Sequence, residues 1–287
     1  MKKYFAMAAA ALALAACDKN NDDLGIDNTK DTPITIQSAG VAELSTRAVN
    51  ELGYLVNEDG DEVVEMSVFV TNGSADKYNA TNVKWTHDGS RWNAASPTLF
   101  EGAGTSQKIY AYYPYVEGST GTITINAADQ TDYLVAISEQ LTASSVNLEM
   151  IHALTKLVLE ATMGTEIAAE EIITKVEVQN MYASGTLTIA DNSWSELSET
   201  PDATLEMTNN EVLVIPMASC DSFPIVITTS AGRVFKTTIS LANVGGKLVA
   251  CNQYKITLKV GQDKVEVGGI SATPWGAPVD GGLLETE

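Results

Sequence analysis

Apolar and polar residues alternate in short runs along most of this chain, and clusters of glycine, asparagine, aspartate and serine separate the runs. Neighbouring side chains of a β-strand point to opposite faces, so this alternation predicts strands with one buried face. The clearest runs are Ile34–Ile36, Val63–Val70, Lys108–Tyr113, Thr122–Ile125, Leu154–Ala161, Lys175–Val178, Thr186–Ile189, Glu211–Ile215, Pro224–Thr228, Val234–Leu241 and Tyr254–Val260. No long amphipathic helical pattern interrupts them. We therefore predict an all-β protein of antiparallel strands packed as sandwiches.

The strand-like runs fall into two groups that meet near residue 150. Aromatic residues crowd one stretch of the first half, whereas the second half is richer in Val, Ile, Leu and Thr. A chain of 287 residues is long enough for two domains of ordinary size. We predict one sandwich over residues 48–150, a second over residues 151–264, and a separate C-terminal segment, residues 265–287.

The N-terminus has the layout of a secretory signal peptide. A basic start, Met1-Lys2-Lys3, precedes the uncharged apolar run Tyr4–Ala16, which is shorter than the roughly 20 residues that span a bilayer. Residues 1–16 are thus predicted to be a signal peptide. The end of this run, Leu14-Ala15-Ala16-Cys17, resembles the lipobox of bacterial lipoproteins, which implies that Cys17 is acylated. The alternative is an ordinary signal peptide with a cysteine there by chance.

A tether and a first strand follow Cys17. The residues directly after it are polar, acidic and free of aromatics, so they cannot bury enough apolar surface to fold, and we expect a disordered tether. Residues 32–44 are predicted to form the first strand of the N-terminal sandwich. Ile34 and Ile36 would face its core, and Pro33 stands at its start, where a missing N–H does least harm.

Arg47 is the only lysine or arginine between residues 31 and 76. It lies between two strand-like stretches, in the kind of exposed connection where proteolysis concentrates. We predict that a trypsin-like protease cuts between Arg47 and Ala48, which would make residues 17–47 a removable propeptide. The alternative is an unprocessed, lipid-tethered protein.

The formal net charge of −20 bears on the partners that the chain can have. A strongly acidic protein repels nucleic acid and anionic lipid surfaces, so we expect no nucleic-acid partner. The simpler interpretation is that the charge only keeps the protein soluble.

Two of the three cysteines, Cys220 and Cys251, remain once Cys17 is acylated. In an oxidising compartment such a pair can form a disulfide. The alternative is two buried free thiols, and the sequence does not decide between them.

The chain lacks the usual patterns of catalytic and metal-binding residues. His87 and His152 are the only two histidines, and neither has a second histidine or cysteine at ligand spacing. His152 stands in an apolar stretch and is expected to be a hydrogen-bonded packing residue. We therefore expect no metal, no cofactor and no enzymatic activity, although a pair of catalytic carboxylates stays open.

Several stretches together resemble one family, the Bacteroidetes fimbrillins, which are the subunits of type V pili. They are the lipobox, Ser45-Thr-Arg-Ala48, Tyr110-Ala-Tyr-Tyr-Pro-Tyr115, Met150-Ile-His-Ala-Leu-Thr-Lys-Leu157 and Ile270-Ser-Ala-Thr-Pro-Trp275. The resemblance implies two transthyretin-like β-sandwich domains and export to the outer membrane as a lipoprotein. It also implies cleavage after an arginine that follows the first strand, which is Arg47 here. The freed groove would then take a strand from another subunit, forming pili that support adhesion and biofilm formation.

The C-terminal segment is the best local candidate for the donated strand, with Val265, Val267, Ile270, Val279 and Leu283 as plugs. Alternatively it is simply the last strand of its own domain. Three functions stay open: a polymerising pilin, a pilus-tip or surface adhesin for a host or bacterial ligand or glycan, and a membrane-retained lipoprotein enzyme or glycan-binding module.

Overall fold

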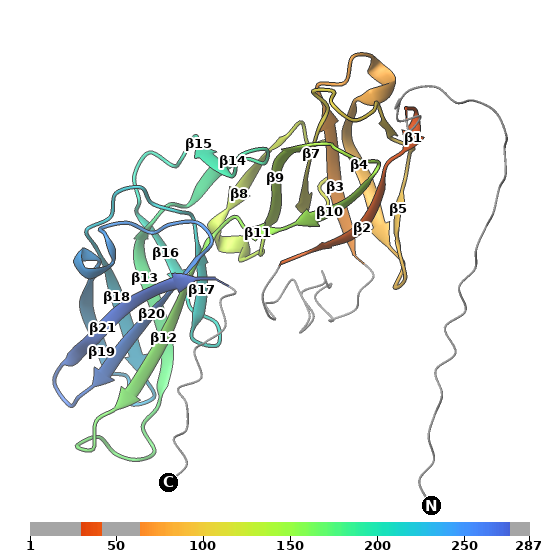
Figure 1. Ribbon diagram of the computed structural model, residues 1–287. Coiled ribbons are helices and arrows are strands. Elements are labelled where there is room, and N and C mark those ends of the chain that lie inside the picture. The colour runs from red at the N-terminus through yellow and green to blue at the C-terminus, as the bar shows by residue number, and fades with distance from the viewer. Residues whose placement is uncertain (1–29, 42–63, 276–287) are drawn as a thin grey trace, which may run out of the picture.

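The computed structural model describes residues 30–41 and 64–275, and Figure 1 shows their strands. The strands are β1 (Thr32–Pro33), β2 (Thr35–Gly40), β3 (Glu65–Thr71), β4 (Ala80–His87), β5 (Trp92–Ala94), β6 (Leu99–Phe100), β7 (Lys108–Tyr113), β8 (Thr122–Asn126), β9 (Leu134–Gln140), β10 (Ser145–Glu149), β11 (Ile151–His152), β12 (Thr155–Met163), β13 (Ile173–Met181), β14 (Ser184–Thr188), β15 (Ser193–Ser195), β16 (Ala203–Glu206), β17 (Glu211–Val214), β18 (Ser222–Thr229), β19 (Val234–Ser240), β20 (Asn252–Val260) and β21 (Val265–Pro274). The only helical elements in this part of the chain are three 3₁₀ turns, η1 (Asp76–Tyr78), η2 (Ala127–Asp129) and η3 (Ala242–Val244). The prediction of an all-β fold is confirmed.

The N-terminal half is built on a six-stranded sheet with the order β11-β9-β7-β3-β4-β5. The pair β10-β2 packs against this sheet, and Ile36 of β2 and Leu148 of β10 share one core cluster with Met66 and Val68 of β3. β3 alternates between two cores, because its next residue, Phe69, belongs to the second cluster. The sheet is therefore covered on both faces.

The C-terminal half contains two four-stranded sheets, β17-β12-β20-β21 and β16-β13-β18-β19 (Figure 1). In β12, β13, β18 and β20 buried residues recur at every second position over most of the strand, so one side of each of these strands enters a common core. Leu157 and Ile256 supply this core from the first sheet, and Val178 and Ile225 supply it from the second. This is the sandwich packing that the alternation predicts.

Two of the strand pairs within residues 30–41 and 64–275 are parallel, which corrects the expectation of antiparallel strands throughout. β2 runs parallel to β10, and β12 runs parallel to β20. Parallel neighbours need a long crossover connection, and in both cases the intervening chain builds other sheets before it returns. The predicted runs locate these strands correctly but contain no information on the direction of a distant partner.

The expected boundary near residue 150 is not a clean division of the structure. β8, from the first half, pairs with β14 in the three-stranded sheet β15-β14-β8, which Figure 1 shows between the two halves. One core cluster accordingly contains Ile123 of β8 together with Leu187 of β14. The expected end of the second sandwich at residue 264 is also too early, since β21 pairs along its length with β20.

The first strand begins where the sequence predicts and is interrupted. β1 and β2 together cover residues 32–40 except Ile34. Ile34 and Ile36 are 4% and 5% exposed, which confirms that they face the core. The predicted continuation to residue 44 lies outside the described residues.

No helix in the described ranges has the length and apolarity needed to cross a membrane.

Candidate functional site: the first strand, the last strand and their anchors

The first strand is held by main-chain bonds to two separate segments, one at Thr98 and one formed by Ser144 and β10. The N–H of Ile34 donates to the carbonyl of Thr98 at 2.8 Å, and the N–H of Thr35 donates to that of Ser144 at 2.8 Å. Beyond these bonds β2 follows β10 in a parallel ladder with an irregularity at Val146. The isoleucines fill the underlying core, so removing this segment would leave an apolar groove with unpaired backbone groups beside β10.

A polar clamp fixes the start of this segment. The N–H of Asp31 donates to the Phe100 carbonyl at 2.9 Å, and its carboxylate accepts a hydrogen bond from Lys77 Nζ at 2.8 Å. The hydroxyl of Tyr78 donates to the same carboxylate oxygen. Lys77 first, and then Tyr78, lower the pKa of Asp31 because both stabilise its charged form. The clamp therefore works with an ionised Asp31.

β21, at the other end of the described chain, lies at the edge of its sheet. It pairs antiparallel with β20, with an irregularity between Thr257 and Leu258. Val265 and Ile270 pack partly against the core, whereas Val267 is 42% exposed. Three of the candidate donor residues thus belong to a strand of the chain's own domain. The other two, Val279 and Leu283, lie outside the described residues, as do Cys17, Arg47 and Ala48.

Immediately after β21, Trp275 closes over a buried polar cluster. Its ring stacks on the imidazole of His152, with 3.6 Å between centroids and an interplanar angle of 7°. The Nδ1 of His152 lies 2.8 Å from Asp132 Oδ1. Lys156 Nζ lies 5.7 Å from the centre of the indole and pairs with Glu211 at 2.8 Å. Two stretches singled out in the sequence, around His152 and Trp275, therefore form one site.

The two thiols are free, so the candidate disulfide between Cys220 and Cys251 is not formed. Cys220 precedes β18 and Cys251 precedes β20, and these strands belong to opposite sheets of the sandwich. The thiol of Cys251 donates to the carbonyl oxygen of His152 at 2.9 Å, not to its imidazole. Burial raises the pKa of both thiols. Nothing in this arrangement prepares either cysteine as a nucleophile.

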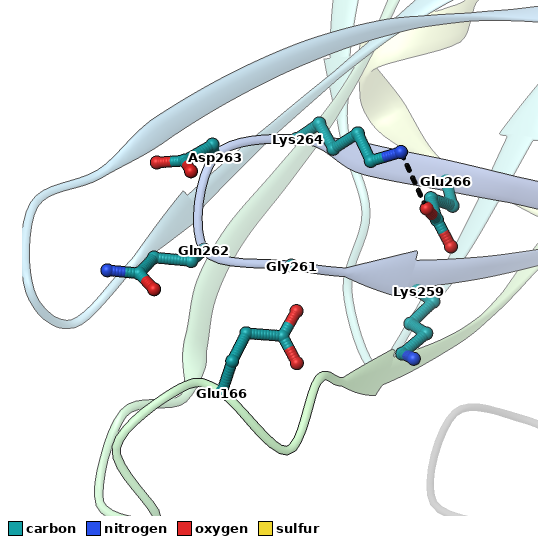
Figure 2. Close-up of a pocket in the computed structure, with 7 residues that line it drawn as sticks. All are labelled: Glu166, Lys259, Gly261, Gln262, Asp263, Lys264 and Glu266. Carbon is teal, nitrogen blue, oxygen red and sulfur yellow. Dashed lines mark ion pairs between the residues drawn. The ribbon is translucent and has the colours of Figure 1, made fainter.

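A charged hollow of about 590 Å³ lies at the far end of the β20–β21 hairpin (Figure 2). Its lining residues are Glu166, Lys259, Gly261, Gln262, Asp263, Lys264 and Glu266. Lys264 pairs with Glu266 at 2.7 Å, as the dashed line in Figure 2 marks. No aromatic side chain lines the hollow, and no group of three or more metal-ligating side chains occurs within residues 30–41 and 64–275. Its three carboxylates and two lysine ammonium groups do not define a ligand.

Solved structures with the same fold come from bacterial proteins described as cell-adhesion or fimbrial proteins. A protein assigned to cell adhesion from Bacteroides uniformis has a TM-score of 0.65 at 20% identity, over 85% of this chain and 99% of that one. A counterpart from Bacteroides ovatus gives 0.60 at 15% identity, over 85% and 98% of the two chains. The tip fimbrial protein Mfa3 from Porphyromonas gingivalis, in a form with a C-terminal truncation, gives 0.54 at 11% identity, over 85% and 100%. Comparison with curated proteins finds no match.

These likenesses define the fold class, the β-sandwich class of fimbrial and cell-adhesion proteins. The sequence itself gives the family: the model of the fimbrillin-like family matches residues 46–275, and the chain belongs to that family. The resemblance identified from the sequence motifs is confirmed. The cluster of Asp132, His152 and Trp275 was not predicted, because the motifs contain two of its members but not their contact.

Proposed function

We propose that this protein is a subunit of a cell-surface pilus that assembles by strand complementation. It would be exported as a lipoprotein through Cys17, cut between Arg47 and Ala48, and joined to other pilin subunits. The pilus would support adhesion and biofilm formation. Membership of the fimbrillin-like family supports the place in a surface pilus. The lipid anchor, the cut and the exchange of strands are inferences from the sequence.

The observation that carries this proposal is the way in which the first strand is buried and paired. Ile34, directly before β2, and Ile36 within it are almost completely buried, yet among the described strands β2 forms its ladder with β10 alone. The chain that follows it contains Arg47 as its only basic residue before Lys77. A cut at Arg47 would leave β2 attached by noncovalent contacts alone. Its departure would open a site for an incoming strand by β-augmentation.

A peptide competition experiment tests the proposal. The purified precursor is cut with trypsin-like protease, the propeptide is removed, and polymer is followed by sedimentation. A synthetic peptide of residues 30–41 should cap the groove and suppress polymerisation. The matched peptide with Ile34→Asp and Ile36→Asp should not, because buried carboxylates would be unpaired in that core. Polymerisation that ignores the first peptide would contradict strand complementation at this groove.

One observation favours the second candidate, a pilus-tip or surface adhesin. β21 is already integrated in its own sheet through Pro274, so it is not a free donor. A tip subunit accepts a strand and donates none. Electron microscopy of labelled cells separates the two: label along the filaments indicates a shaft subunit, and label confined to their ends indicates a tip subunit.

A further inference from the structure

The last strand has little apolar contact of its own. Most of its residues are exposed, and only Val265 and Ile270 pack partly against the core. Gly268 and Gly269 lie at the irregularity in the ladder and add no side chain to the packing. Within the described part of the chain, no strand pairs with the outer edge of β21. Such a strand is held mainly by its ladder to β20 and by whatever fixes its ends.

Trp275 is the side chain that fixes the end of this strand. It is 8% exposed, the most buried side chain from Val265 to the end of the described chain. Its main-chain N–H donates to the carbonyl of Cys251 at 2.6 Å. Its indole ring lies flat on the imidazole of His152. Stacking of large aromatic rings combines apolar burial with a specific geometry. The apolar contact of the segment is thus concentrated at one residue.

The surface under Trp275 belongs to the junction of the two halves. His152 is 1% exposed and lies on β11, which pairs with β9 of the N-terminal sheet. Asp132 comes from the segment just before β9 and holds the imidazole. The ammonium group of Lys156, on β12, lies 5.7 Å from the centre of the Trp275 indole. Trp275 therefore ties the last strand to both halves at once.

The contact also contains unsatisfied polar atoms. Asp132 Oδ2, His152 Nε2 and Trp275 Nε1 are all buried without a hydrogen-bond partner among the described residues. A buried polar atom without a partner opposes the closed arrangement, and water would satisfy it once the indole moves away. The contact is therefore close-packed, but its unpaired polar atoms reduce the free energy needed to open it.

We propose that Trp275 is a latch that keeps β21 in its own sheet. His152 provides the surface on which the indole stacks, and Asp132 holds His152 in place. Withdrawal of the indole from His152 is the event that loosens the strand. The use of this event in assembly rests on the proposed function, since a loosened β21 can serve as a donor. The latch itself is a property of the single, unassembled chain.

Hydrogen exchange on the full-length, unassembled protein tests the latch. Trp275→Ala should raise the exchange rates of the amides in residues 265–274 by about tenfold or more, because the stacked contact that closes the strand is lost. The amides of β13 and β18 should keep their rates. His152→Ala should have the same effect, and the double variant should add little to either. Trp275→Phe keeps an aromatic ring without the unpaired Nε1 and should restore most of the protection.

Trp85→Ala is the matched control. Trp85 is a buried tryptophan with an unpartnered Nε1 in the other core cluster, so its removal destabilises the protein without touching β21. Unchanged exchange of β21 in Trp275→Ala overturns the latch, and so does an equal rise in Trp85→Ala. Faster exchange without any polymer after cleavage would support the latch and contradict the proposed function.

Discussion

Truncation of Ile36 to alanine is the sharpest test of how the first strand is held. Its side chain is 5% exposed and sits in the cluster to which β2, β3, β4, β6, β7, β9 and β10 contribute. Replacing a buried isoleucine by alanine removes its transfer free energy and leaves a cavity, which together cost about 2–5 kcal/mol. For a protein of this size, each kcal/mol lowers the midpoint of thermal unfolding by roughly 2–4 °C. We expect the midpoint to fall by roughly 4–20 °C.

The assay is calorimetry of the uncut protein, paired with denaturant unfolding at one temperature. Ile137→Ala is the control, because Ile137 on β9 is 45% exposed and its truncation should change the free energy of unfolding by less than about 0.5 kcal/mol. A loss below about 1 kcal/mol for Ile36→Ala would refute the reasoning, since such a side chain would not be filling the groove. After cleavage at Arg47 and removal of the propeptide, the wild-type protein and the Ile36→Ala variant consist of the same residues. The two should then unfold identically.

Three further predictions concern processing of the N-terminal segment. Growth with labelled palmitate should label the wild-type protein and not Cys17→Ala; equal labelling would show that Cys17 is not acylated. N-terminal sequencing of surface-released protein should begin at Ala48, and Arg47→Gln should prevent release; a start at Cys17 would contradict the cut. In protein cut after Arg47, the propeptide should dissociate faster as the pH falls below about 4: the pKa of Asp31 is lowered in the folded state, so its contribution is complete above its unfolded value of about 3.9 and is lost as the pH falls through the lowered value. The Asp31→Asn variant should lose this pH dependence, as monitored by size-exclusion chromatography, and an unchanged dependence would exclude the clamp with Lys77 as its cause.

Alternation in the sequence predicts strands where one face is buried and the other is wet. β18 and β20 show this pattern over their lengths, and both lie where the runs Pro224–Thr228 and Tyr254–Val260 predict them. In the turn between β18 and β19, Gly232 takes a φ of +76°, a conformation that favours glycine.

Two strands in other environments, β4 and β9, give no such pattern. The start of β9 is buried on consecutive residues because the sheet is covered on both faces, and β4 is half-buried along most of its length. Neither stretch is among the predicted runs. The pairing of strands is even harder to predict from the sequence. β8 pairs with β14 across the expected boundary, and no local pattern indicates this pairing.

The candidate site also contains one part that the sequence could predict and one part that it could not. Ile34 and Ile36 could be predicted as core residues because their burial follows from period-two alternation. The stacking of Trp275 on His152 depends on Asp132 as well, and these three residues are distant in sequence and belong to different sheets or connections. Only the fold brings them together.

The parallel ladder between β2 and β10 has a consequence for the symmetry of any assembly built at this groove. β10 offers its backbone groups in one direction and one register, so a strand that replaces β2 and restores the same bonds must enter with the same orientation. Donor and acceptor surfaces are then different patches, and the interface between subunits is heterologous. Repetition of a heterologous contact that does not close on itself gives an open filament with two unlike ends. In a fibre assembled at this groove, the direction of this one short strand would set the polarity of the fibre.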